Sequence, residues 1–446
     1  MMKETLLDRA KKIYEDNIQI DNITIRLSEK YDIPYENVKT SVVRALLNTL
    51  SEPRKSHMRQ KSPILKRFIQ YYLIMGYFAL LAIFGAKFKS EKADILFDEK
   101  FTLFNNTWFP TYYEPILHYF AQKKYQCKAF LNPLLRAHIF AKRELLFSYP
   151  IPVINRKYSY FYFEKEIAQK IVSNDFFLFQ NLYKISKEIE LDFVNIYLRL
   201  IRQIAVSESQ SKNVSAKFLI TAGDHYFNGI HYYIIKKNGI QHIITIQNGL
   251  RKKDTEGACN YFYSDYYLAH NEETAFNYLN NTFCDKKIPT GSFLSAVLVH
   301  QFREENLPLN NDILFWHHPA ERINTRTKFP GTLPMVKTII DHLSRFIQEH
   351  PQLKLRYITK SNVDGNEFYE ECKEKLNYSN VTFEAVYGND SYKRVYQSRL
   401  IVNIWSTMGY ESLGFDKKVL HVSYEHLADT LLMQDFIEDN LGSLHE

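Results

Sequence analysis

The clearest structural pattern in this chain is the stretch RLIVNIWSTMGYESLGFDKKVLHVSY, which spans residues 399–424. Its Val and Ile runs do not alternate with polar residues, and this is typical of a parallel strand that is covered on both faces. We therefore predict a buried strand over 400–405, a Ser-Thr turn, a short helix over 408–415 and a second strand over 419–422.

Ser406 and Thr407 stand where this strand ends and the helix begins. Their hydroxyls can cap the helix, and free backbone N–H groups at such a point attract anions. Glu411 follows Thr407 by four residues, so it lies on the same helical face one turn further on. Two interpretations stay open. Either the turn holds a phosphate while Glu411 binds ribose or sugar hydroxyls, or the turn is an N-cap followed by a solvated glutamate.

From residue 92 onward, strand-like and helical runs alternate. The strand-like runs include KADILFDEK (92–100), AKFLITAGDHYF (216–227), IQHIITIQNG (240–249), DILFWHH (312–318) and LKLRYITKS (353–361). Helices of this length between strands build parallel sheets with right-handed crossovers. We predict an α/β fold with two Rossmann-like domains facing across a cleft, and an N-terminal helical extension. Polar residues at the strand ends place a ligand in the cleft.

With 446 residues, the chain is long enough for two or three domains. We divide it into a helical module with a basic linker (1–66), an apolar membrane-associating helix (67–88), a first Rossmann-like domain (89–304) and a second one (305–446). The net charge of +7 favours anionic partners such as nucleotide donors and lipid phosphates, and it does not require nucleic acid.

The four cysteines stand far apart at positions 127, 259, 284 and 372. This spacing argues against a zinc site and a disulfide framework, and it favours a reducing compartment. No HExxH, P-loop or GxGxxG motif is present, which disfavours a metalloprotease, an NTPase and an NAD enzyme. No paired carboxylates of the metal-binding type follow a strand. We therefore predict no catalytic metal and no cofactor.

Residues 68–86, FIQYYLIMGYFALLAIFGA, carry no charge and just reach the length of a membrane span. A basic run precedes them, formed by Arg54, Lys55, Arg59, Lys61, Lys66 and Arg67. The segment can span the bilayer, lie in its interface or be a buried core helix. Basic residues keep their side of a span cytoplasmic, so one crossing would move the large C-terminal part outside, away from nucleotide donors. We therefore favour peripheral membrane contact at the cytoplasmic face.

Several polar residues at predicted strand ends are candidates for a site. Asp224 and His225 end a strand in the first half, where a general base would have to lie, although Asp224 can equally cap the next helix. His318 ends the first strand of the second half, and Lys360 ends another. Each has an ordinary alternative: a packed or capping imidazole for His318, and a solvated loop residue for Lys360.

The order of parts resembles that of GT-B glycosyltransferases. The motif Ser406, Thr407, Gly409, Tyr410 and Glu411, followed by Lys418-Val419, resembles the closing motif of bacterial surface-carbohydrate transferases. That group includes the capsular Kdo transferases and, more distantly, the CDP-glycerol glycerophosphotransferases. In this sequence Lys and Val are adjacent, whereas the family spaces them by one residue. The likeness covers about 68–425.

A second match is ITIQNGLR (244–251), which is similar to a loop of polysaccharide-biosynthesis proteins. It implies that Gln247, Asn248 and Arg251 position acceptor or donor, although Asn248-Gly249 is also a plain turn. One departure concerns the His-Pro pair that contacts the CMP donor in Kdo and sialic acid transferases. In this sequence His318-Pro319 stands at a different strand end from Lys360, which leaves the donor nucleotide open.

The resemblance implies an inverting glycosyltransferase that moves a sugar from a nucleotide donor to a surface polysaccharide or lipid-linked glycan. The first domain would hold the acceptor, with Asp224 and His225 as catalytic residues. The second would hold the donor, through Ser406, Thr407, Glu411, Lys360 and His318. Two alternatives stay open: a glycerophosphate or polyol-phosphate transferase, and a non-catalytic scaffold with a degenerate transferase fold.

Overall fold

The computed structural model describes residues 5–51, 64–85, 89–98, 116, 119–120, 122–130, 153–154, 165–221, 227–247, 261–272, 274–278, 282–317, 332–359, 367–386, 389–403 and 407–422. The chain divides into two compact units, of which the first comprises residues 1–104 and 117–290 and the second comprises residues 105–116 and 291–446. The predicted boundary at 304/305 differs from this division.

The difference is the helix α14 (Phe293–Glu304), which the prediction assigns to the first domain. It packs instead on α18 (Asn389–Tyr396) and η4 (Ser412–Phe415) of the second unit. The Phe302 ring lies 5.5 Å from the Tyr396 ring and 6.2 Å from the Phe415 ring. Contacts with aromatic residues about a hundred positions further along the chain therefore place this helix in the second unit.

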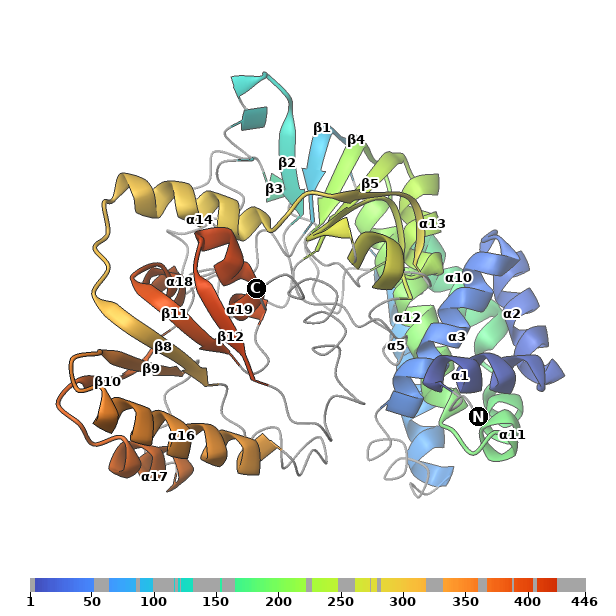
Figure 1. Ribbon diagram of the computed structural model, residues 1–446. Helices are drawn as coiled ribbons and strands as arrows, with labels where there is room; N and C mark the ends of the chain where they lie inside the picture. Colours follow the sequence, from blue (N-terminus) through green and yellow to red (C-terminus); the bar gives the residue numbers. More distant parts are fainter. Residues whose placement is uncertain are drawn as a thin grey trace. The chain divides into compact units, whose positions relative to one another are not determined.

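The first unit contains a sheet of seven parallel strands among the described residues, in the order β3-β2-β1-β4-β5-β6-β7. The strands are β1 (Glu91–Phe97), β2 (Cys127–Phe130), β3 (Val153–Ile154), β4 (Val214–Thr221), β5 (Ile240–Ile246), β6 (Tyr263–Ala269) and β7 (Phe283–Pro289). β1 lies between β2 and β4, so the chain winds outward from it in both directions (Figure 1).

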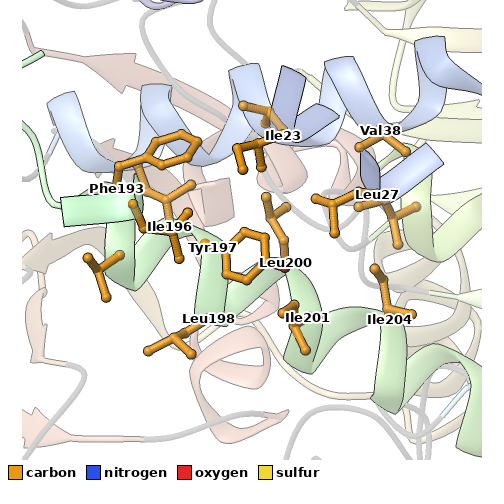
Figure 2. Close-up of a cluster of buried hydrophobic side chains, with 14 of the residues drawn as sticks. Ile23, Leu27, Val38, Phe193, Ile196, Tyr197, Leu198, Leu200, Ile201 and Ile204 are labelled. Carbon is orange, nitrogen blue, oxygen red and sulfur yellow. The ribbon is translucent and has the colours of Figure 1, made fainter. Parts of the chain in front are cut away.

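Among the described residues, the helices of the first unit are α1 (Leu6–Glu15), α2 (Ile18–Tyr31), α3 (Tyr35–Ser51), α5 (Ile64–Phe84), α10 (Lys165–Asp175), α11 (Phe179–Glu188), α12 (Phe193–Ser211), α13 (Gly229–Lys237) and the π-helix η3 (Thr274–Tyr278). α12 is the centre of the helical layer because most of its side chains are buried. Ile23 and Leu27 of α2 and Val38 of α3 belong to the same buried cluster as Phe193 and Tyr197 of α12 (Figure 2).

Residues 5–51 are therefore part of the core of the first unit and not a separate helical module. A buried ionic contact supports this packing. The Asp175 carboxylate, which ends α10 and is fully buried, lies 2.8 Å from the Nζ of Lys30 on α2. The Tyr31 hydroxyl donates a hydrogen bond of 3.3 Å to the same carboxylate. Apolar stripes on short helices have to be buried against other elements, and here α1, α2 and α3 pack on one another while α3 also packs on α12 and α13.

α5 corresponds to the predicted apolar segment at 68–86. Within the described part of the chain, it is the one helix whose length and composition would allow a membrane crossing. Tyr71, Met75 and Phe78 on one of its faces are buried in the core cluster, next to α10 and α12. The core-helix interpretation therefore holds for this face.

The second unit contains five parallel strands among the described residues, in the order β10-β9-β8-β11-β12. They are β8 (Asn311–His317), β9 (Leu355–Thr359), β10 (Val381–Ala385), β11 (Ser398–Asn403) and β12 (Lys418–His421). The remaining helices are α16 (Thr332–Glu349), α17 (Glu367–Lys375) and α19 (Thr407–Glu411). Two doubly wound parallel sheets confirm the predicted α/β class with two Rossmann-like domains.

Candidate functional site

In a doubly wound sheet, ligands bind outside the carboxyl ends of the strands, where two neighbouring strands continue in opposite directions. This switch point lies between β1 and β4 in the first unit, and between β8 and β11 in the second. Each unit therefore has one favoured edge. The polar side chains at these two edges are the candidates for function.

At the switch point of the first unit, Asp98 follows the last residue of β1 and Thr221 is the last residue of β4. The Thr221 hydroxyl donates a hydrogen bond to the Asp98 carboxylate, and both side chains are buried. The Asp98 N–H extends the strand pairing by donating to the Ile220 carbonyl at 3.0 Å. A buried polar group needs such a partner, so the pair fixes the ends of both strands relative to one another.

Gln247 and His270 continue this edge at the ends of β5 and β6. The Gln247 Oε1 accepts a hydrogen bond of 2.7 Å from the His270 backbone N–H, and the His270 Nε2 lies 3.1 Å from the Gln247 carbonyl oxygen. Gln247 is buried. Its side-chain oxygen therefore joins two strand ends, in addition to any role toward a ligand.

Most of the other predicted site residues lie outside the described residues. This applies to Asp224, His225, Asn248, Arg251, His318, Lys360 and Ser406, and to the side chain of Thr407. Their predicted roles stay predictions. By sequence, Asp224 and His225 follow β4, His318 follows β8, and Ser406 follows β11, which are all strands at the two switch points.

In the second unit, Asn403 ends β11 and its side chain fills the space beside Gly409. A Cβ atom built on Gly409 would lie 2.2 Å from the Asn403 side-chain amide. The Asn403 Nδ2 lies 3.1 Å from the His421 Nδ1, and the Tyr410 ring stacks on the His421 ring at 4.4 Å. Burial lowers the pKa of His421 to about 4, so this imidazole is neutral at pH 7. The glycine of the motif is thus required by a close contact with the preceding strand.

Glu411, the last residue of α19, is buried with 5% of its surface exposed. Its Oε1 accepts a hydrogen bond of 3.2 Å from the Ser292 hydroxyl, and its Oε2 accepts one of 2.5 Å from the Tyr392 hydroxyl. Burial raises the pKa of Glu411 to about 7, while the two hydrogen bonds act in the opposite direction.

These contacts correct the interpretation of Glu411 as a solvated glutamate that follows an N-cap. The carboxylate joins α19 to the start of α14 and to α18, and the Ser295 hydroxyl donates to the Glu411 carbonyl at 3.1 Å. Because its pKa is about 7, the Glu411 carboxyl group gains or loses its proton near neutral pH while it stays in these hydrogen bonds. A direct role toward ligand hydroxyls stays a prediction.

The sequence analysis does not identify four residues of the Asp98–Thr221 pair and of the hydrogen bonds to Glu411: Asp98, Thr221, Ser292 and Tyr392. Asp98 could have been found by the rule that identified Asp224, since it is also a carboxylate directly after an apolar run. Ser292 and Tyr392 are 119 and 19 residues away from Glu411, and no local pattern connects them.

The second unit also has an open groove of about 580 Å³ between α16 and the β11–β12 side of the sheet. Its lining is mostly apolar and includes Leu343, Phe346, Val402 and Leu420. A nucleotide phosphate requires hydrogen-bond donors or cations, so the polar edge at the switch point is the better place for a donor. Among the described residues, no group of three or more His, Cys, Asp or Glu residues is arranged to hold a metal ion.

No family model matches this chain, and no curated protein sequence matches it. Solved structures with a similar course of the chain include a UDP-GlcNAc 2-epimerase from Neisseria meningitidis, with 13% identity and a TM-score of 0.41 over 77% of this chain and 85% of that one. A glycosyltransferase from Rickettsia africae has 12% identity and a TM-score of 0.34, over 75% and 79% of the two chains. MurG from Acinetobacter baumannii has 11% identity and a TM-score of 0.30, over 80% and 91%. Values of this size do not define a substrate or a reaction for this chain.

Proposed function

We propose that this chain is a metal-independent glycosyltransferase that transfers a sugar from a nucleotide-activated donor to a bacterial surface polysaccharide or a lipid-linked glycan. The observation that carries the proposal is the presence of two doubly wound parallel sheets in one chain, each with buried polar contacts at its switch point. The proposal also draws on the likeness of residues 399–424 to surface-carbohydrate transferases. We further propose that the enzyme acts at the cytoplasmic face of the membrane.

The donor is assigned to the second unit. Ser406 and Thr407 follow β11 in the sequence. Asn403, which precedes them, and Gly409, which follows them, are in close contact with each other. The hydroxyls of Ser406 and Thr407, with Lys360 and His318, would bind the donor phosphates and stabilise the charge that develops on the leaving nucleotide. Glu411 supports this arrangement from inside the unit through Ser292 and Tyr392.

The acceptor is assigned to the first unit. Attack by an acceptor hydroxyl requires a group that removes its proton in the transition state, and Asp224 and His225 are the candidates. They follow β4, whose last residue, Thr221, is bonded to Asp98. In this proposal the Asp98–Thr221 pair is a positioning contact that fixes the strand end from which the catalytic segment continues.

The first test is a thermal-shift measurement on the full chain with CMP, CDP, UDP and GDP. Free nucleotide at about thirty times its dissociation constant stabilises a protein by about 2 kcal/mol, so millimolar nucleotide reveals weak sites. We expect at least one nucleotide to raise the melting temperature. The Gly409→Ala variant should lose this rise, since the new Cβ meets Asn403, whereas Gly76→Ala, whose Cβ meets open space, should keep it.

The second test is transfer from the sugar nucleotide that contains the stabilising base. Asp224→Asn should remove transfer while nucleotide stabilisation persists. Label transfer from CDP-glycerol in place of a sugar nucleotide would select the polyol-phosphate alternative. If no nucleotide stabilises the full chain, the transferase proposal fails and the scaffold alternative is favoured.

A further inference from the structure

α5 has two different faces, and one of them is fixed in the first unit. Tyr71, Met75, Phe78 and Leu81 are buried at intervals of three or four residues. On the same face, the Arg67 guanidinium forms an ion pair with the Asp192 carboxylate, and both side chains are almost fully buried. The Tyr71 hydroxyl donates a hydrogen bond to the Asp175 carbonyl oxygen. This face therefore cannot leave the unit without separating a buried ion pair.

The opposite face of α5 is apolar and exposed. Its large exposed side chains are Leu65, Phe68, Ile69, Leu73, Leu80, Ile83 and Phe84. They follow one side of a 21-residue helix, which is about 30 Å long. A Cβ on Gly76, in the middle of this side, would meet nothing within 4 Å. A contiguous apolar face of this size on a folded domain marks an interaction surface.

The apolar surface extends beyond α5 to the turn between α10 and α11. Phe177 in this turn is 87% exposed. Its ring lies 5.4 Å from that of Phe176, which in turn lies 5.2 Å from the Tyr72 ring on α5. A second element thus adds a protruding aromatic side chain next to the exposed face. We call these eight exposed residues, Phe177 and the seven on α5, the α5 face.

The stretch of sequence that contains and flanks α5 carries charges of a single sign. Residues 53–90 contain eight Lys or Arg residues and no Asp or Glu. Arg67 is buried in its pair with Asp192, and the seven other cations are Arg54, Lys55, Arg59, Lys61, Lys66, Lys87 and Lys89. Apolar side chains between cations are the combination that binds an anionic lipid surface, where the apolar groups enter the headgroup boundary and the cations meet the phosphates.

We propose that the α5 face docks on an anionic phospholipid surface, with α5 parallel to the membrane and its outer side chains inserted. This inference rests on the proposed function and deepens it, because the face would bring the enzyme to a lipid-linked acceptor. A full crossing is disfavoured by the buried Arg67–Asp192 pair on the inner face of the helix. A twofold dimer through the same face is disfavoured because it would bring two segments of like charge together.

The test is co-sedimentation of the full chain with vesicles of phosphatidylglycerol and phosphatidylcholine, compared with phosphatidylcholine alone. We expect binding to the anionic vesicles that weakens at high salt. The double variant Leu73→Glu/Leu80→Glu should bind at least tenfold more weakly. The matched control Ile18→Glu/Leu309→Glu changes two exposed apolar residues, one at the start of α2 and one in the connection before β8, and should bind like the parent. Circular dichroism melting of both variants reports whether they fold.

Equal binding by the parent and the folded Leu73→Glu/Leu80→Glu variant would overturn the proposal. Resistance of the membrane-bound protein to extraction by alkaline carbonate would indicate a crossing and would also overturn the proposal. A third contradicting result would be a parent protein that forms a dimer and binds no vesicles, together with a variant that is a monomer. Nucleotide thermal shifts on the same proteins keep the two proposals apart. Vesicle binding without any nucleotide effect would support membrane docking and contradict the transferase proposal. A nucleotide effect without vesicle binding would contradict membrane docking alone.

Discussion

The hydroxyl of Tyr392 donates a hydrogen bond of 2.5 Å to Oε2 of Glu411, a carboxylate buried where α14, α18 and α19 meet. Ser292, the residue that caps α14, donates to the other oxygen of the same carboxylate. The motif over residues 406–411 thus contains a titratable carboxyl group, Glu411, that is buried and hydrogen-bonded to two other helices. This contact makes the stability of the second unit dependent on pH.

The first prediction concerns that dependence. The pKa of Glu411 is about 7 in the folded protein, above the usual glutamate value of 4.5, so between these two pH values the folded state keeps a proton that the unfolded state loses. The contribution of Glu411 to the free energy of unfolding must therefore fall as pH rises from about 4.5 to 7, by up to about 3 kcal/mol. Glu411→Gln does not titrate. Its stability relative to the parent should increase between pH 5 and pH 8.

The measurement is urea unfolding at pH 5, 6, 7 and 8, followed by circular dichroism. Glu374→Gln, which changes an exposed carboxylate on α17, is the control and should follow the parent at every pH. If Glu411→Gln also follows the parent throughout, Glu411 does not titrate in this window.

The second prediction concerns Gly409. An added Cβ would lie 2.2 Å from the Asn403 amide, so Gly409→Ala must displace either β11 or α19. Such overpacking typically costs about 1–3 kcal/mol. Gly76→Ala, on the exposed side of a helix, should be neutral or stabilising by up to about 1 kcal/mol, because alanine favours helix. Chemical denaturation of both variants distinguishes the two positions, and an equal stability of the two would contradict the close contact.

The third prediction concerns the attachment of the N-terminal helices. Asp175→Ala leaves Lys30 and Arg26 next to an empty position in the core, since both extend toward this carboxylate. Removing one partner of a buried ion pair costs about 3–5 kcal/mol. Asp285→Ala, an exposed position on β7, should change stability by less than about 0.5 kcal/mol. Limited proteolysis should release residues 5–51 earlier in Asp175→Ala than in the parent, and identical digestion patterns would refute this packing.

The fourth prediction concerns the switch point of the first unit. Thr221→Val removes the hydroxyl that donates to the buried Asp98, which should cost about 1–3 kcal/mol. If the pair positions the segment that follows β4, the maximal transfer rate should fall while nucleotide stabilisation in the second unit stays unchanged. Thr382→Val, at an exposed position on β10, is the matched control. Loss of nucleotide stabilisation in Thr221→Val would show that the assignment of the two units is wrong.

The sequence pattern was informative wherever a local run determines the structure. The predicted strands at 400–405 and 419–422 correspond to β11 and β12, and the predicted helix at 408–415 to α19 and η4. The run Leu400–Val402 of β11 leaves a clear pattern because no position along it is polar, whereas β12 is an edge strand on which Leu420 is 51% exposed.

Contacts between distant residues were not predictable in this way. Asp175 and Lys30 are 145 positions apart, and an apolar stripe on a helix indicates a buried face without naming its partner. α5 gave an ambiguous pattern for a related reason. Leu73 on its exposed face is as apolar as Met75 on its buried face, so periodicity does not separate the two.

The packing of α2 against α12 has a consequence for the synthesis of the chain. Phe193 follows Ile23 by 170 positions, and ribosomes add about 5–20 residues per second, so about 10–30 s pass between the two. Throughout this interval the emerging N-terminal helices lack the surface that covers Ile23 and Leu27. α1, α2 and α3 can pack on one another during this interval, but the side chains that face α12 stay uncovered, so nascent chains of this protein should bind chaperones that recognise apolar segments at the ribosome exit.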